Sequence, residues 1–182
     1  MTAGDAVPHV RRATLADVPE LQAMIARSAR GLSEGFYTPQ QIESAVRHMF
    51  GVDTQLVHDG TYFVVEADGA LVAGGGWSRR RTLFGGDQFK QGEDASLDPA
   101  RDAARIRAFF VDPSWARRGL GRLLFEACRS AAAAAGFTTL KLLATLPGEP
   151  LYTALGFTVR ERVTVTLPDG VAVPGAVMSR PV

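Results

Sequence analysis

The fold is decided by the stretch VDPSWARRGLGRLLFEACRSA, which runs from Val111 to Ala131. Its centre, Arg117–Arg122, holds three arginines and two glycines within six residues. The residues that follow have the apolar spacing of an amphipathic helix. The start of a helix carries a partial positive charge, so arginines there are unfavourable unless a negatively charged group binds. The stretch therefore predicts an anion site at the start of this helix.

The two glycines indicate which anion fits. Glycine lets a turn bend sharply and lets a ligand approach the main chain without a Cβ in the way. The first N–H groups of a helix have no partner inside it and point outward. Together with the three arginines, such N–H groups suit a diphosphate; a turn with solvated arginines is the alternative. The stretch has neither the P-loop spacing nor the third glycine of a dinucleotide-binding motif.

Length and composition predict one globular domain over residues 1–182, because the chain has 182 residues of which 46% are hydrophobic. The net charge of +1 offers no overall attraction to nucleic acid or to an anionic membrane. Cys128 stands alone, which excludes an intramolecular disulfide and fits a reducing compartment. The first residues have no apolar signal segment, so we expect a cytoplasmic protein that does not span a membrane.

The order of elements predicts a mixed α/β sheet with one parallel, right-handed crossover. Asp68-Gly69 marks a hairpin turn, Thr38 and Gln41 mark a helix start, and Gly136 marks a helix end. Strands are expected over 9–14, 61–67, 70–78, 104–111, 138–144, 158–167 and 171–180, and helices over 15–32, 38–50, 120–135 and 149–157.

Two segments in the middle of the chain carry further expectations. Residues 82–103 lack periodicity, and so long a loop inside a compact domain is usually functional or mobile. The following strand, ARIRAFFV, has the alternation of a strand with two different faces. Alternation places Ile106, Ala108 and Phe110 on one face and Arg105, Arg107 and Phe109 on the other.

The sequence FFVDPSWARRGLGRLLFEACRSAAAAAGF, followed by EPLYTALGF, resembles the GNAT superfamily of N-acetyltransferases. The two motifs have the order and separation of that family, and the resemblance covers nearly the whole chain. It implies a mostly antiparallel mixed sheet of about six or seven strands with about four helices, in which strands four and five splay apart. Ala116 departs from the family's usual Arg or Gln, and Ala144 and Thr145 stand where many relatives have Asn.

The resemblance implies acetyl-coenzyme A as cosubstrate and assigns residues to it. The main chain of Phe109, Phe110 and Val111 would pair with the pantetheine amides as an added strand does. The pyrophosphate would lie on the segment made of Arg117, Arg118, Gly119, Leu120, Gly121 and Arg122. Tyr152, in EPLYTALGF, would donate a proton to the departing thiolate, whereas a buried aromatic with a structural hydroxyl is the alternative.

The acceptor side is less well defined by the sequence. The resemblance implicates residues 31–39, notably Phe36 and Tyr37, together with Trp77 and the segment 78–89. A bolder hypothesis is that arginines 79–81 with Arg107 favour an acceptor bearing a carboxylate. The strand 104–111 has no carboxylate to deprotonate the amine. Glu149, Asp87, Glu66 and a chain of waters therefore stay open as routes for the proton.

These observations predict a cytoplasmic, acetyl-CoA-dependent N-acetyltransferase that acts by direct attack on the primary amine of a small molecule. A protein or peptide N-acetyltransferase and a non-catalytic acyl-CoA sensor are the alternatives. Cys128 is expected in the core rather than as a nucleophile. The three histidines lack metal-ligand spacing, so no metal is expected. Relatives often pair through their last strands, and the C-terminal strands here are long enough for a homodimer.

Overall fold

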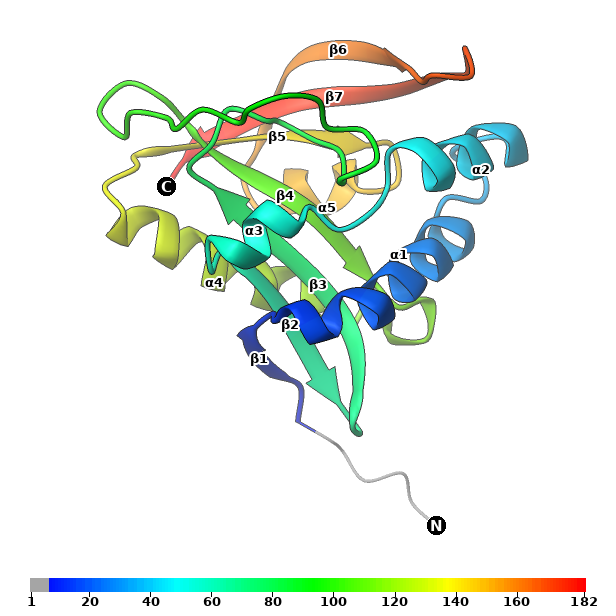
Figure 1. Ribbon diagram of the computed structural model, residues 1–182, viewed down its shortest axis with the longest axis horizontal. Helices are drawn as coiled ribbons and strands as arrows, with labels where there is room; N and C mark the ends of the chain where they lie inside the picture. The colour runs from blue at the N-terminus through cyan, green and yellow to red at the C-terminus, as the bar shows by residue number, and fades with distance from the viewer. Residues whose placement is uncertain (1–6) are drawn as a thin grey trace.

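The computed structural model describes residues 7–182, which form a mixed sheet with helices on both faces (Figure 1). The strand order is β1-β2-β3-β4-β5-β7-β6, and within it β4 and β5 are the parallel pair. The strands are β1 (His9–Arg12), β2 (Tyr62–Ala67), β3 (Ala70–Ser78), β4 (Ala104–Val111), β5 (Thr139–Thr145), β6 (Thr158–Thr166) and β7 (Ala172–Pro181). The helices are α1 (Val18–Leu32), α2 (Pro39–His48), α3 (Thr54–His58), α4 (Leu120–Ala134) and α5 (Glu149–Ala154), with 3-10 turns at Leu15–Asp17 and Pro113–Trp115. The predicted mixed sheet with a parallel crossover is confirmed.

The helices cover the sheet in two layers, because alternate residues of each strand point to opposite faces. Leu21 and Met24 of α1 pack with Val64 of β2 on one face. Leu124 of α4 packs with the next residue, Val65, on the other face. Figure 1 shows α1 crossing one side of the sheet while α4 lies behind it. Within residues 7–182, every helix is too short or too polar to span a lipid bilayer.

Two structures predicted from local sequence signals, a helix cap and a tight turn, are confirmed. Thr38 caps α2, since its hydroxyl accepts from the Gln41 N–H at 3.2 Å and the Gln41 side chain accepts from the Thr38 N–H at 2.9 Å. Asp68 and Gly69 both have positive φ, at 53° and 74°, as a tight turn between β2 and β3 requires.

Helix α3 was missed in the sequence prediction. It has five residues, which is too short to establish a helical repeat of apolar positions. Its start is nevertheless well made, because the Asp53 carboxylate accepts from the Gln55 N–H at 3.0 Å. The helix matters for function because it positions Asp53 beneath the long loop between β3 and β4.

The predicted alternation of β4 was wrong, because a β-bulge interrupts the strand. Ala108 has a φ of 52°, and the register against β3 shifts between Gly74 and Gly76. Ile106 consequently packs on the α4 face, whereas Ala108 and Phe110 pack on the α1 face, and Phe109 joins Ile106. An alternating pattern contains no marker for one extra residue, so the sequence alone predicted a regular strand.

Two neighbouring residues fix this bulge. The Tyr62 hydroxyl, fully buried, donates to the Ala108 carbonyl at 3.1 Å. On the opposite face, Gly75 leaves room for the Phe109 ring, since a Cβ at Gly75 would lie only 2.4 Å from that ring. The glycine-rich end of β3 therefore makes the distorted end of β4 possible.

Candidate active site

The sheet splits beyond the first residues of its parallel pair. β4 and β5 pair only through Ala104 with Leu140 and Arg105 with Lys141. β4 stays bonded to β3 as far as Val111, and β5 stays bonded to β7 as far as Thr145. The facing edges therefore diverge and leave main-chain groups without a strand partner. Such edges can bind an extended ligand that carries amides.

A cavity of about 220 Å³ lies at this split. Its walls come from both strands, from the end of α1, from the segment before α3, from the long loop and from α5. The lining residues are Ser28, Ala29, Leu32, Ser33, Met49, Phe50, Gly51, Leu83, Phe84, Gly85, Gly86, Ile106, Ala108, Phe109, Phe110, Val111, Leu143, Thr145, Pro147, Gly148, Leu151 and Tyr152. Phe109, Phe110 and Val111, which the sequence assigns to the cosubstrate, are all among them.

The start of α4 presents a run of main-chain N–H groups without acceptors. Among the hydrogen bonds of residues 7–182, none uses the N–H groups from Arg117 to Arg122, and the first bond of the helix runs from the Leu123 N–H to the Gly119 carbonyl. Gly119, at a φ of 81°, and Arg117, at 61°, turn the chain into the helix. A Cβ at Gly121 would lie 2.7 Å from the Leu151 side chain, so glycine here also lets α5 pack closely. This geometry suits an anion of several oxygens.

The arginines beside these N–H groups are available for a negatively charged ligand. Arg117, Arg118 and Arg122 are exposed, and none of them forms an ion pair within the described part of the chain. Arg118 lies over the Trp115 ring, with its guanidinium carbon 4.7 Å from the ring centroid. This cation–π contact holds the guanidinium near the helix start.

Ala116, which stands where the family usually has Arg or Gln, uses its N–H within the protein. The Ala116 N–H donates to the Pro113 carbonyl at 3.3 Å, which closes the 3-10 turn before α4. Alanine therefore supplies neither a charged side chain nor a free N–H at this position. The free N–H groups begin at the next residue.

Tyr152 lies on α5 with its ring among aromatic side chains and its residue 8% exposed. The Phe109 and Phe157 ring centroids lie 6.2 Å and 5.8 Å from its own. Burial, with a smaller effect of the neighbouring Cys128, raises the pKa of the Tyr152 hydroxyl, so the phenol keeps its proton at neutral pH. No hydrogen bond within residues 7–182 uses this hydroxyl, which leaves it available to a ligand in the cavity.

Cys128 lies in the core on the same face of the sheet and is fully buried. Burial raises the pKa of its thiol, so the thiolate form that a nucleophile needs is disfavoured. The predicted packing role is confirmed.

The carboxylates considered as bases lie outside the cavity. Glu149 forms an ion pair with Arg162 at 2.6 Å, and Glu66 forms one with Arg11 at 2.8 Å. Hydrogen bonds from these arginines lower the pKa of both carboxyl groups, which makes them weaker bases. Asp87 accepts from the Thr54 N–H at 3.0 Å. None of the cavity-lining residues within 7–182 is Asp, Glu or His.

The residues predicted to contact the acceptor lie beside the cavity or farther away. Phe36 is exposed, and Trp77 is buried in the core against Phe137. The Tyr37 hydroxyl donates to the Pro174 carbonyl at 2.6 Å and accepts from the Leu146 N–H at 2.9 Å. Tyr37 thus fastens the start of α2 to β7 and to the segment after β5. None of the three lines the cavity.

Of the arginines 79–81 and Arg107 that were expected to favour a carboxylate on the acceptor, Arg107 and Arg80 are already paired within the protein. The Arg107 side chain is buried and donates to Asp53 at 3.1 Å and to the Gly85 carbonyl at 2.7 Å. Arg80 forms an ion pair with Asp59 at 2.6 Å. Burial lowers the pKa of Arg107, and the Asp53 carboxylate opposes this effect. Both guanidinium groups therefore form ion pairs with carboxylates of the protein itself.

The loop between β3 and β4 forms one wall of the cavity and is held by hydrogen bonds. Its Gly86 N–H donates to the Met49 carbonyl at 2.8 Å, and its Gln88 side chain donates to the Phe50 carbonyl at 2.8 Å. A Cβ at Gly86 would lie 2.7 Å from the Gly51 main chain, so glycine lets the two segments touch. The resulting wall, residues 83–86, belongs to the segment 78–89 that the family resemblance implicates in acceptor binding. The paired glycines 85 and 86 allow its close main-chain contact.

Comparisons with known proteins agree with this geometry. The family model of the acetyltransferase (GNAT) domain matches residues 58–159, more than half of the chain. No curated protein sequence matches the chain. Among solved structures, a GCN5-related N-acetyltransferase from Rhodopseudomonas palustris is similar, with a TM-score of 0.72, 18% identity, and 97% of each chain covered.

Two further structures share the fold at low identity. PaiA N-acetyltransferase from Thermoplasma acidophilum, solved in complex with coenzyme A, has a TM-score of 0.63 and 12% identity, over 97% of this chain and 99% of that one. The ribosomal-protein-S18-alanine N-acetyltransferase from Escherichia coli has a TM-score of 0.57 and 18% identity, over 96% and 94%.

The chain belongs to the GNAT acetyltransferase family. Its activity is therefore acetyl-CoA-dependent N-acetylation. The split sheet, the free N–H groups of α4 and the nearby arginines fit the amides and phosphates of coenzyme A. No group of three or more His, Cys, Asp or Glu side chains within residues 7–182 is arranged to hold a metal ion.

The α4 start gives a direct test of cosubstrate binding. Replacing Gly119 by alanine forces a side chain into a left-handed conformation, which costs about 1–2 kcal/mol, and should turn the N–H groups away from the phosphates. We expect Gly119→Ala to weaken coenzyme A binding about tenfold, measured by isothermal titration calorimetry. Gly170→Ala is the matched control, because Gly170 has a φ of 83° and equally open surroundings in the distant β6–β7 turn. Equal affinity in the two variants would contradict the assignment.

Proposed function

We propose that the protein transfers the acetyl group of acetyl-CoA to the primary amine of a small molecule, by direct attack within a ternary complex. The observation that carries the proposal is the Tyr152 hydroxyl, which lines the cavity at the split between β4 and β5 and has no partner among residues 7–182. The burial of Cys128 disfavours a covalent route through a cysteine. Direct transfer needs only that amine and thioester be held together.

Each part of the site has a role in this reaction. The main chain of β4 after the bulge would hold the pantetheine arm, and the N–H groups from Arg117 to Arg122 would hold the pyrophosphate. The amine nitrogen forms a bond to the thioester carbonyl carbon while the carbon–sulfur bond breaks. The departing sulfur takes the proton of Tyr152, and the proton that the amine loses returns to Tyr152 through water.

The shape of the cavity supports a small acceptor over a protein. Its walls include α1, the segment before α3 and the loop wall 83–86. These walls are joined to one another by the hydrogen bonds from Gly86 and Gln88. A cavity of about 220 Å³ is small for a site that must also hold the end of pantetheine.

The role of Tyr152 is tested by Tyr152→Phe. The change keeps the ring contacts to Phe109 and Phe157 and removes the proton donor. Turnover, followed as free thiol released, should fall by up to about 10²-fold, while the affinity for coenzyme A stays the same. Unchanged turnover would remove Tyr152 from the reaction.

The pH dependence tests the source of the free amine. The cavity lining within residues 7–182 contains no Asp, Glu or His, so kcat/KM should rise with pH as the acceptor itself deprotonates. Because burial raises the pKa of Tyr152, its proton is retained and no falling limb is expected up to about pH 9. Two acceptors of different basicity should give two different inflection points. One common inflection would instead indicate a base on the enzyme.

A further inference from the structure

In the proposed function the cosubstrate lies along β4, which leaves the cavity walls from α1, the segment before α3 and the long loop to the acceptor. We call these walls the acceptor end. Leu32 of α1, Met49 and Phe50 before α3, and Leu83 and Phe84 of the long loop supply most of its side chains. The Phe50 ring meets Phe110 of β4 edge to face, at 5.6 Å between centroids. This end of the cavity is therefore aliphatic and aromatic.

The polar side chains of the whole cavity are hydroxyls. Ser28 on α1 and Ser33 directly after it are buried, Thr145 ends β5, and Tyr152 lies on α5. The Thr145 hydroxyl already accepts from the Gly148 N–H at 3.2 Å. Within residues 7–182, no lining residue carries a charge. A carboxylate or a second ammonium on the acceptor would enter this space without a counter-charge, which is strongly unfavourable.

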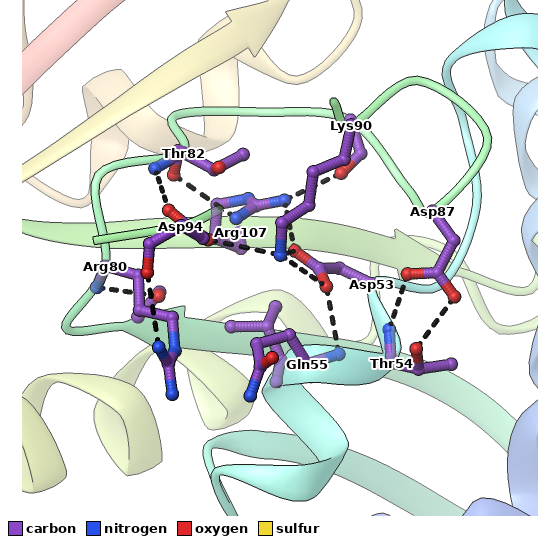
Figure 2. Close-up of polar contacts among 12 residues, drawn as sticks. Asp53, Thr54, Gln55, Arg80, Thr82, Asp87, Lys90, Asp94 and Arg107 are labelled. Carbon is purple, nitrogen blue, oxygen red and sulfur yellow. Dashed lines mark hydrogen bonds and ion pairs between the residues drawn. The ribbon is translucent and has the colours of Figure 1, made fainter. Parts of the chain in front are cut away.

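A cluster of charged residues behind the loop wall is paired internally. Figure 2 shows Arg107, Asp53, Lys90 and Asp94 gathered between β4, the start of α3 and the loop. Lys90 lies 3.2 Å from the Asp53 carboxylate and 3.1 Å from Asp94. These pairs neutralise the charges of the four residues, and none of the four lines the cavity.

The same network fixes the wall in place. Arg107 donates to the carbonyls of Thr82 and Gly85, which flank Leu83 and Phe84, at 3.2 Å and 2.7 Å. The Thr82 N–H donates to the Asp94 carboxylate at 2.8 Å. Arg107 is thus a positioning residue for the wall, and the apolar side chains of the wall are presented in one arrangement.

We propose that the acceptor is a primary amine with an uncharged, apolar body, either aralkyl or alkyl, received between α1 and the loop wall 83–86. This inference rests on the proposed transferase function and narrows its substrate class. An apolar surrounding also favours the neutral form of the amine, which is the nucleophile. The site thereby selects the reactive form without a dedicated base.

Matched amines test the proposal with the full-length protein and acetyl-CoA. Phenethylamine is compared with phenylalanine, which adds a carboxylate, and hexylamine with 1,6-diaminohexane, which adds a second ammonium. Thiol release is expressed per concentration of free base, so that differences in amine pKa do not contribute. The uncharged member of each pair should have the higher kcat/KM, by about tenfold or more.

Two variants locate the acceptor. Leu83→Arg places a cation in the loop wall and should reduce the preference for phenethylamine over phenylalanine about tenfold or more. Leu15→Arg is the control, because Leu15 is exposed in the first 3-10 turn and lies outside the cavity lining. Unchanged affinity for coenzyme A shows that each variant is folded. An unchanged preference in folded Leu83→Arg would overturn the placement.

The outcomes separate this inference from the function on which it rests. Thiol release that is equal or faster with the charged amine of each pair would overturn the acceptor class and leave the transferase intact. Faster transfer from hexanoyl-CoA than from acetyl-CoA, with no preference among amines, would assign the apolar space to the acyl chain and also overturn it. Binding of coenzyme A without thiol release from amines, amino acids or peptides would instead remove the proposed function and favour an acyl-CoA sensor.

Discussion

The site depends on the separation of β4 from β5, and that separation begins beside one bulge. The parallel pair ends after Arg105 and Lys141. Three residues later the positive φ of Ala108 rotates the strand, and Tyr62 and Gly75 hold it there. Unpaired main-chain groups inside a protein are costly, so a split of this kind persists where a ligand or solvent can satisfy them. The bulge and the binding of an amide-containing cosubstrate are thus two parts of one arrangement.

Charge is distributed unequally around the split. Arginines without acidic partners in the described chain surround the start of α4, where phosphates would bind. At the other end, Arg107 and Lys90 are neutralised by Asp53 and Asp94, and the interior offers only hydroxyls. The start of α4 therefore suits the charged part of the cosubstrate, whereas the cavity suits an uncharged acceptor. The net charge of +1 conceals this polarity.

The sequence predicted most of the fold because its strongest signals are local. The Asp68-Gly69 turn, the Thr38 cap and the glycine-containing start of α4 each act within a few residues. The bulge at Ala108 depends instead on Tyr62 and Gly75, which belong to other strands. Alternation in one strand carries no information about them.

The family resemblance implicated two segments of the acceptor walls, 31–39 and 78–89, but how these segments pack was beyond local reasoning. Arg107 and Asp53 are 54 positions apart, and their pairing became visible only with α3, which is too short to predict from periodicity. The loop over 82–103 lacks a repeating pattern because its order comes from bonds to residues 49–53. Phe36, Tyr37 and Trp77 were chosen because they are aromatic residues in suitable segments. Other residues line the cavity.

The central claim is that main-chain groups of β4 and of the α4 start are unpaired and become occupied by the cosubstrate. Amide hydrogen exchange, measured residue by residue with and without coenzyme A, tests it most directly. The amides of Arg117–Arg122, and those within Phe109–Val111 that point away from β3, should gain protection, while those of the β6–β7 hairpin stay unchanged. Bound coenzyme A that leaves both segments exchanging as before would contradict the account.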